Sequence, residues 1–334
     1  MELDLPFIWA ALIAFAVLAY VVLDGFDLGI GVLFPLIDRG RDRDIAMNSV
    51  APVWDGNETW LVLGGGGLFA VFPLAYATIF PALYAPLIAM LLGLIFRGVA
   101  FEFRHRTLRG KFLWDWGFAG GSILAAFAQG ITLGALVQGI EVENRAYAGG
   151  WWDWLTPFSL LTGVALLAGY ALLGATWLVM KTEGHLLRRA RDCAWVSGIA
   201  TLALIGAVSL ATPFLDRSYL ERWFAWPTVV FSVVVPLLVA GCAWLLFRGL
   251  RDHRTAQPFL AALALFVLCY AGIGISFYPY IVPTSVTIWE AAGPDESLAF
   301  LLVGAAVLIP IILAYTAYAY WVFRGKVDPE EGYH

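Results

Sequence analysis

The chain has 334 residues, of which 61% are hydrophobic and only 13% are charged, and its mean hydropathy is +0.80. Soluble domains are about 25% charged and about 45–50% apolar, so this composition excludes an ordinary soluble protein. A membrane-spanning helix needs roughly 20 residues, so nine of them with short connections use most of the chain and leave no room for a soluble domain.

Nine apolar stretches predict an all-α integral membrane protein with nine transmembrane helices. We expect the spans at about 6–37, 50–73, 79–103, 113–140, 155–181, 194–213, 224–248, 258–280 and 298–324. Pro6-Phe7 and Pro157-Phe158 each open a long helix rich in Gly, Ala and Leu, and each begins a set of four spans that cross in the same alternating directions. This internal repeat indicates two four-helix bundles, in residues 1–140 and 141–280. Residues 281–334 then form an outer loop, a peripheral ninth helix and a cytoplasmic tail.

The basic residues set the orientation. All but three of the 20 lysines and arginines lie in or beside five alternating connections, and the exceptions are Arg145, Arg217 and Arg222. Connections that are rich in Lys and Arg stay in the cytoplasm. We therefore expect the amino terminus outside and the carboxyl terminus in the cytoplasm, which requires an odd number of spans.

Four acidic residues lie within the first two spans, where an unpaired charge is costly. Asp24 and Asp27 belong to the segment LDGFDLGIG, and Asp55 and Glu58 belong to the segment APVWDGNETWLVLGGGG. The members of each pair are three residues apart, so on a helix both carboxylates share a face. Span one leads into the cytoplasm and span two returns from it. Both pairs are therefore expected in the cytoplasmic half, on neighbouring antiparallel helices.

Arg97 is the basic residue that we expect at the same depth. It lies about seven residues before Arg104, near the cytoplasmic end of span three. One arginine neutralises one carboxylate and leaves the other acids in excess. Uncompensated acids in a low-dielectric medium are expected to bind protons near neutral pH. Protonatable groups inside a membrane are typical of proton relays.

A purely structural interpretation of these acids stays open. Span two can begin its helix at Pro52, which would put both of its acids in the first turns, where they complement the helix dipole. Span one can end near Leu23, which would put its acids at the membrane surface. Against this, each intramembrane charge costs at least about 2.5–3.5 kcal/mol. We expect Asp115, at the start of span four, to be a first-turn acid at the membrane surface.

The histidines are poorly placed to bind haem. His105, His185 and His253 lie in basic connections, and His334 ends the chain. Haem in a helix bundle usually needs a His or Met on an inward-facing position, so we expect no haem ligand on this chain. No metal-ligand spacing, phosphate-binding loop or dinucleotide fingerprint occurs in the sequence. Neither a metal ion nor a nucleic acid is an expected ligand.

Four motifs together resemble subunit II of cytochrome bd-type quinol oxidases. They are LDGFDLGIG, NSVAPVWDGNETWLVLGGGGLFAVFP, FRGVAFEFRHR and WDWG, and the likeness continues through FYPYIVP and VLIPIILAYTAYAYW. The short chain is similar to the cyanide-insensitive branch of that family. The resemblance implies a multi-pass protein of the bacterial inner membrane, built from two four-helix bundles and a peripheral helix.

The resemblance also implies a partner and an activity. The partner would be subunit I, which holds two b-type haems, one d-type haem and the site of quinol oxidation. Together the subunits form a respiratory-chain enzyme that oxidises quinol and reduces oxygen to water with protons from the cytoplasm. Subunit II stabilises subunit I and supplies acids of a proton path to the oxygen site. Lipids, a quinone in a structural site and a small accessory subunit are further partners that the family admits.

The site residues that the resemblance implies come from its motifs. Glu58 stands where other members can have an uncharged residue, so the resemblance does not by itself assign it to the path. The matching positions are Asp27, Trp54, Asp55 and Arg97, with Asp24 beside them.

Two other hypotheses compete with the oxidase. A proton-coupled secondary transporter places broken helices and charges near the middle of the membrane, which acids confined to the cytoplasmic half fit less well. A scaffold whose polar residues only specify packing would respond to neutralising substitutions in its assembly and not in turnover. Haem absorbance that co-purifies with a second membrane chain would favour the oxidase over the transporter.

Overall fold

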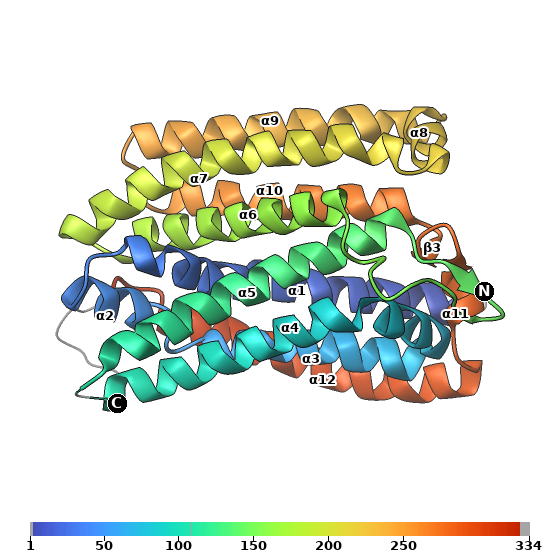
Figure 1. The fold of residues 1–334 in the computed structure, drawn as a ribbon, viewed down its shortest axis with the longest axis horizontal. Coiled ribbons are helices and arrows are strands. Elements are labelled where there is room, and N and C mark those ends of the chain that lie inside the picture. Colours follow the sequence, from blue (N-terminus) through green and yellow to red (C-terminus); the bar gives the residue numbers. More distant parts are fainter. Residues whose placement is uncertain (1–2, 108, 328–334) are drawn as a thin grey trace.

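In the computed structural model, which describes residues 3–107 and 109–327, the chain is a set of long helices that run side by side (Figure 1). His334 and the rest of the tail from residue 328 lie outside the described residues. The prediction of an all-α membrane protein is confirmed, because eight of the described helices are long and apolar enough to cross a membrane. These helices are α1 (Leu5–Leu33), α4 (Pro73–Arg106), α5 (Lys111–Gln138), α6 (Pro157–Lys181), α7 (Gly184–Ala211), α9 (Thr228–Arg251), α10 (Ala256–Phe277) and α12 (Asp295–Val322).

One further long helix and several short elements connect this set. The long one is α3 (Trp54–Val71), which lies beside α1 and α12. The two-stranded antiparallel sheets pair Val142 with Tyr147 and Tyr280 with Thr287. The short elements are η1 (Phe34–Leu36), α2 (Arg41–Asn48), β1 (Val142–Glu143), β2 (Ala146–Tyr147), η2 (Thr212–Phe214), α8 (Arg217–Phe224), β3 (Tyr280–Val282), β4 (Val286–Thr287) and α11 (Ile288–Ala291).

Helix starts follow local capping chemistry. Asp4 caps α1 by accepting a hydrogen bond of 3.1 Å from the backbone N–H of Phe7, and a proline occupies the first turn. Thr156 and Ser159 form a reciprocal capping box at the start of α6, again with a proline in the first turn. Such caps satisfy backbone donors that a helix leaves free at its start. Both helices therefore begin at the proline-containing segments from which the sequence predicted them.

The predicted boundary between spans two and three is displaced. We expected span three to begin at about residue 79, but α4 begins at Pro73, two residues after α3 ends at Val71. The backbone of Leu83 leaves the helical region, with φ −118° and ψ 15°, between two prolines inside α4. Proline removes a helical hydrogen bond and so favours a kink, which bends the start of α4 across the end of the bundle.

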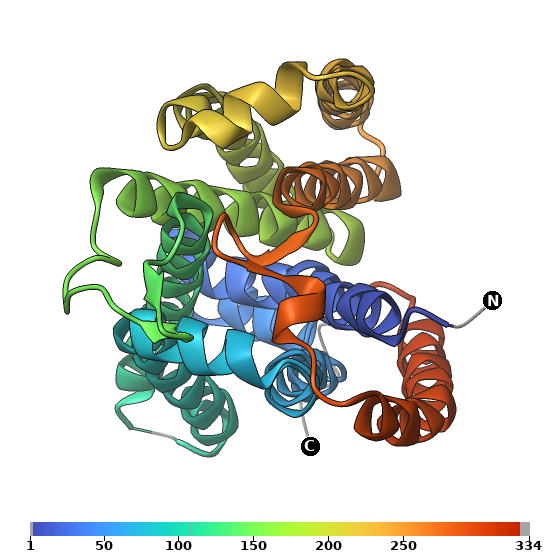
Figure 2. The same cartoon turned by 90° about the vertical axis from the view of Figure 1, so that its right-hand side faces the viewer.

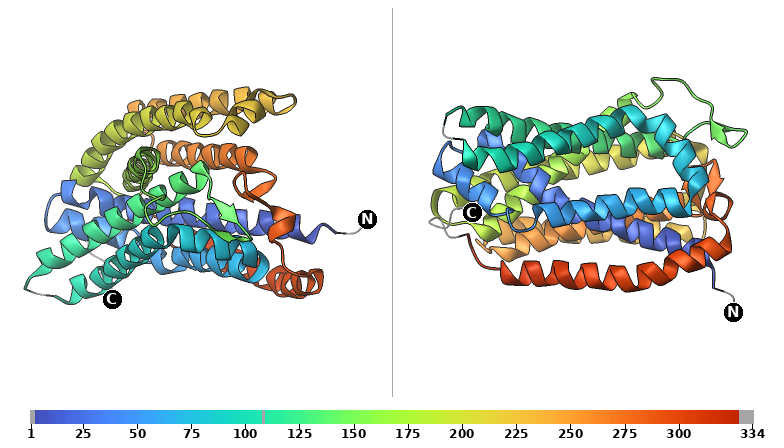
Figure 3. Two further views of the ribbon diagram at one scale, coloured as in Figure 1. Left: turned by 45° about the vertical axis from the view of Figure 1, so that its right-hand side comes forward. Right: turned by 90° about the horizontal axis from the view of Figure 1, so that it is seen from below.

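Helix α1 is the centre of the molecule, since it packs against α3, α5 and α6 (Figure 2). Its closest approach is to α6, where a Cβ on Gly29 would overlap the backbone carbonyl of Tyr170, and one on Gly174 would overlap the backbone of Gly29. Small residues at such crossings let helix backbones approach closely in a membrane. Helix α12 lies at the edge of the set of helices (Figure 3), with only 6% of its most apolar segment buried.

Candidate functional site

Two of the predicted acids, Asp24 and Asp27, lie deep inside the protein on α1. The helix continues past both residues to Leu33. Both side chains are 0% exposed. A charged group in such surroundings is tolerated only when opposite charges or hydrogen-bond donors compensate it. Those partners come from the neighbouring helices.

The main partner is Arg97 on α4, whose guanidinium is enclosed by three carboxylates. Its Nη1 atom lies 3.2 Å from Oδ1 of Asp24 and 2.8 Å from Oε1 of Glu58 on α3. Its Nη2 atom lies 3.8 Å from Oδ2 of Asp27. The Cζ atom is also 5.7 Å from the centre of the Trp54 ring, within cation–π range. Helices α1, α3 and α4 thus meet at one buried charge cluster, consisting of these five residues.

The charge of this cluster is not balanced when every member is ionised. One guanidinium would then face three carboxylates, two of them fully buried, and two negative charges would remain without a partner. Such unpaired buried charges are strongly unfavourable. The cluster can therefore hold protons on its carboxyl groups, and carboxyls that interact this closely titrate together as a unit. Exchange of protons among neighbouring acids is the chemistry that the arrangement permits.

Asn57 on α3 completes the surroundings of Asp27, and sequence reasoning missed its role. Its Nδ2 donates hydrogen bonds to Oδ2 of Asp27 at 2.7 Å and to the backbone oxygen of Leu23 at 3.2 Å. Its Oδ1 accepts a hydrogen bond of 2.9 Å from the hydroxyl of Tyr320 on α12. The available signal was that an amide inside a membrane span needs partners. Nothing in the sequence pointed to Tyr320.

A chain of hydrogen bonds extends the polar interior on the other side of Asp24. The hydroxyl of Tyr170 donates to Oε1 of Gln129 at 2.8 Å, and Nε2 of Gln129 donates to the hydroxyl of Tyr20 at 2.6 Å. Tyr20 precedes Asp24 by one helical turn on α1. The chain joins α1, α5 and α6 and was not predicted from the sequence.

Asp55 is not part of the buried charge cluster. It lies in the first turn of α3, which begins at Trp54 and not at Pro52, and its side chain is exposed. Within residues 3–107 and 109–327, its carboxylate makes no hydrogen bond or ion pair. Glu58 is one turn further along, retains 28% exposure of its side chain and contacts Arg97. The acids therefore form a series from the surface, through a partly open position, to the interior.

A second set of charges lies where α2, α4 and α5 come together, apart from the buried charge cluster. Asp115 pairs with Arg43 at 2.6 Å and with Arg104 at 2.5 Å. Asp44 pairs with Arg104 at 2.6 Å and with Lys111 at 3.1 Å. Partial burial would raise the pKa of Asp44, but the hydrogen bonds from Arg104 and Lys111 outweigh it and hold the pKa below its ordinary value. Asp115 lies in the second turn of α5, one turn later than we expected.

The three histidines among the described residues lie at or beyond helix ends and not in the middle of the bundle. His105 lies in the last turn of α4, and His253 follows the end of α9. His185 has its Nδ1 2.8 Å from Oδ2 of Asp42 and its Nε2 3.7 Å from Oδ2 of Asp38. These three side chains are close enough together to offer ligands to a metal ion. The two ring nitrogens face different carboxylates, so each acid is contacted by its own side of the ring.

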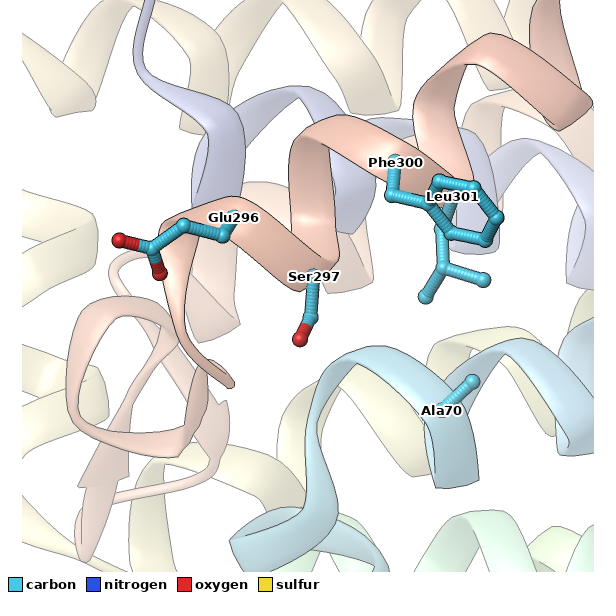
Figure 4. A pocket seen from close by; sticks show the side chains of 5 residues that line it. All are labelled: Ala70, Glu296, Ser297, Phe300 and Leu301. Carbon is cyan, nitrogen blue, oxygen red and sulfur yellow. The ribbon is translucent and has the colours of Figure 1, made fainter.

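A groove of about 470 Å³ opens between the far end of α3 and the start of α12 (Figure 4). Along α3 it lies about 18 Å from Glu58, at 1.5 Å per residue, so it does not open onto the buried charge cluster. Its lining is apolar except for one carboxylate and one hydroxyl. The lining residues are Ala70, Glu296, Ser297, Phe300 and Leu301.

Comparisons with known proteins agree with the motifs. A family model described as cytochrome bd terminal oxidase subunit II matches residues 5–323. The cytochrome bd-I ubiquinol oxidase subunit 2 of Escherichia coli (strain K12) is 32% identical over 371 aligned positions, which cover 98% of this chain and 96% of that protein. The cytochrome bd ubiquinol oxidase subunit 2 of Bacillus subtilis (strain 168) is 30% identical and is covered to 97%, as is this chain.

The fold is shared with a solved structure. A chain of the bd oxidase from Geobacillus thermodenitrificans matches with a TM-score of 0.74 and 18% identity, over 97% of this chain and 100% of that chain. The sequence relationship and the fold therefore agree over nearly the whole length. The chain belongs to the family of cytochrome bd terminal oxidase subunit II.

Proposed function

We propose that the chain is the haem-free subunit II of a bd-type quinol:oxygen oxidoreductase of a bacterial inner membrane, and that it stabilises a haem-bearing subunit I. The family assignment supports this proposal, as do relatives whose names describe subunit 2 of ubiquinol oxidases. Two b-type haems and one d-type haem are expected on the partner. The complete enzyme oxidises quinol and reduces oxygen to water.

The proposed topology has nine crossings, namely the eight long apolar helices and α3. Its 18 residues rise about 27 Å, close to the roughly 30 Å thickness of the hydrocarbon. Two acids at its start lower its hydropathy. Nine crossings agree with an amino terminus outside and a carboxyl terminus in the cytoplasm. We further propose a first bundle in residues 1–140 and a second in 141–280, which meet where α1 crosses α6.

We also propose that the buried charge cluster carries protons from the cytoplasm toward the oxygen-reducing site of subunit I. The observation that carries this proposal is the sharing of Arg97 by three carboxylates on two helices. Asp55, exposed one turn from Glu58, is the position at which protons enter or leave the cluster. The Trp54 ring lies within cation–π range of the guanidinium, and Asp27 is the buried acid that accepts a hydrogen bond from Asn57.

Substitution of Asp55 by Asn tests the proton path. The exposed carboxylate has no partner in the described part of the chain, so Asp55→Asn is expected to leave assembly intact. Loss of a proton-transfer group should slow quinol-driven oxygen consumption by roughly tenfold or more. Asp295→Asn is a matched control, because Asp295 is also an exposed first-turn acid, at the start of α12. Wild-type turnover of an assembled Asp55→Asn complex would remove Asp55 from the path.

Asp27→Asn is a second, independent variant. It retains the size of the side chain and tests the interior of the path. If the polar residues served only to specify packing, both variants would reduce the amount of haem-containing complex and leave turnover per haem unchanged. A reduced-minus-oxidised spectrum of the purified complex separates the oxidase from a transporter, which would purify as a colourless homo-oligomer.

A further inference from the structure

We infer that Tyr320, on the outermost helix α12, is a positioning residue for Asp27 and acts through the side chain of Asn57. This inference rests on the proposed function, in which Asp27 exchanges protons. It assigns to α12 a part in the proton path, although this helix contributes no acidic side chain to the buried charge cluster.

Helix α12 is attached to the rest of the chain at a few points. Near its start, the Trp9 indole N–H donates a hydrogen bond of 3.0 Å to the backbone oxygen of Leu298. Just beyond its end, the Lys181 ammonium donates to the backbone oxygens of Phe323 and Gly325. Tyr320 lies next to this second attachment, which holds its helix turn against the interior.

The Tyr320 ring is held by aromatic neighbours. Phe26 and Trp177 each contact it edge-to-face, with ring centres 6.4 Å apart. Both contacts involve only the ring. The hydroxyl is free of them and donates a hydrogen bond of 2.9 Å to Oδ1 of Asn57. A phenylalanine at this position keeps the ring and removes only that hydroxyl. The role of the hydrogen bond can therefore be separated from the role of packing.

The Asn57 amide has a complete set of partners in one orientation only. Its two N–H groups are directed at Oδ2 of Asp27 and the oxygen of Leu23, and its oxygen receives the Tyr320 hydroxyl. Asn57 is 1% exposed, so water cannot replace a lost partner. Without the hydroxyl, the amide oxygen becomes a buried acceptor with no donor, which is strongly unfavourable and favours a shift of the side chain. The hydrogen bond to Asp27 shifts with it.

Asp27 depends on this donor because its other close neighbours are charged or acidic. Arg97 on α4 is 3.8 Å away, whereas Asp24 on α1 and Glu58 on α3 are acids that share the same guanidinium. The Asn57 N–H at 2.7 Å is the short neutral contact among them. Its position therefore affects how readily Asp27 takes up and releases a proton.

The test compares Tyr320→Phe with Tyr318→Phe in the complete oxidase. Tyr318 is on the same helix and its side chain is 63% exposed, so the same chemical change there should leave turnover and its pH profile at the wild-type level. Tyr320→Phe is expected to retain full haem content and to shift the pH profile of turnover. It should lower turnover by roughly three- to tenfold, which corresponds to the free energy of one hydrogen bond.

A double-mutant cycle tests whether Tyr320 acts through Asn57. In an Asn57→Ala complex, adding Tyr320→Phe should cause no further loss, because residues that act through one another are not additive. Additive losses, or wild-type turnover and pH profile in Tyr320→Phe, would overturn the inference. A loss of turnover only in proportion to a loss of haem would also overturn it, by assigning Tyr320 to assembly.

Asp27→Asn, measured in parallel, distinguishes this inference from the proposed function. Slow turnover in Asp27→Asn with wild-type behaviour in Tyr320→Phe would contradict the role of Tyr320 alone. Wild-type turnover in an assembled Asp27→Asn complex would contradict the proton path, and with it the role given to Tyr320.

Discussion

Arg97 and Asp24 form an ion pair that is completely removed from water, with Nη1 3.2 Å from Oδ1 and both side chains 0% exposed. In a buried pair, each charge is tolerated only because the other is present. Removal of one charge leaves the other buried without a partner, which is much less favourable than removal of both. The pair therefore predicts how the subunit responds to single and double substitutions.

Arg97→Gln should strongly destabilise the protein, because it leaves three carboxylates without a cation. We expect a loss of about 3–5 kcal/mol and little haem-containing complex. Adding Asp24→Asn should recover part of the loss, since fewer buried acids then lack a partner. Thermal unfolding and the yield of purified complex measure both effects. A double variant that is less stable than Arg97→Gln alone would contradict this account of the cluster.

Glu58→Gln tests whether this position belongs to the proton path. The amide oxygen can still accept a hydrogen bond from Arg97, so we expect normal assembly, but it cannot carry a proton at neutral pH. Turnover should fall by roughly tenfold or more. Glu296→Gln, at an exposed position in the first turn of α12, serves as the control. Equal rates of oxygen consumption in the two variants would place Glu58 outside the path.

Gly29→Ala tests the crossing of α1 and α6. A Cβ at Gly29 would overlap the backbone of Tyr170, whereas nothing lies within 4 Å of a Cβ at Gly65 on α3. We expect Gly29→Ala to separate the helices and to cost about 3 kcal/mol or more, seen as a lower melting temperature and yield. Gly65→Ala makes the same change in open space and should match the wild type in the isolated chain.

The ion pairs of Asp44 predict a pH dependence of stability. Hydrogen bonds from Arg104 and Lys111 lower its pKa in the folded protein below the ordinary 3.8. The stabilisation is complete above the ordinary pKa and is lost as the pH falls through the lowered one. Asp44→Asn should therefore be less stable than wild type near neutral pH, with the difference shrinking in strong acid. A difference in melting temperature that stays constant from pH 6 to pH 3 would contradict this prediction.

The sequence predicted the part of the site in which charge is conspicuous. Asp24, Asp27 and Arg97 stand out because each interrupts an apolar stretch, and helix spacing alone places both aspartates on one face. The structure brings them together with Glu58 and Trp54. Asp55 was predicted with them from the same motif, but the first turn of α3 directs it outward. Where a helix begins depends on packing, which spacing does not reveal.

The neutral partners could not be predicted for a different reason. Tyr320 lies more than 260 residues from Asn57 in the chain, and tyrosine is common near membrane surfaces. Tyr318 lies two residues away in the same apolar segment, so the local sequence does not distinguish it from Tyr320, yet its side chain is exposed. Gln129 likewise has no charge to mark it. Only the arrangement of α5, α6 and α12 around α1 shows which of these polar groups turn inward.

The most direct test of the account is the uptake of protons from the cytoplasmic side by the Asp27→Asn complex, reconstituted in vesicles and matched for haem content. Uptake that accompanies oxygen reduction is followed with a pH indicator, with Asp295→Asn as the control. We predict that Asp27→Asn slows uptake and oxygen consumption together, by roughly tenfold or more, while Asp295→Asn retains both. Wild-type rates of proton uptake in the assembled Asp27→Asn complex would contradict the claim that the buried acids carry protons.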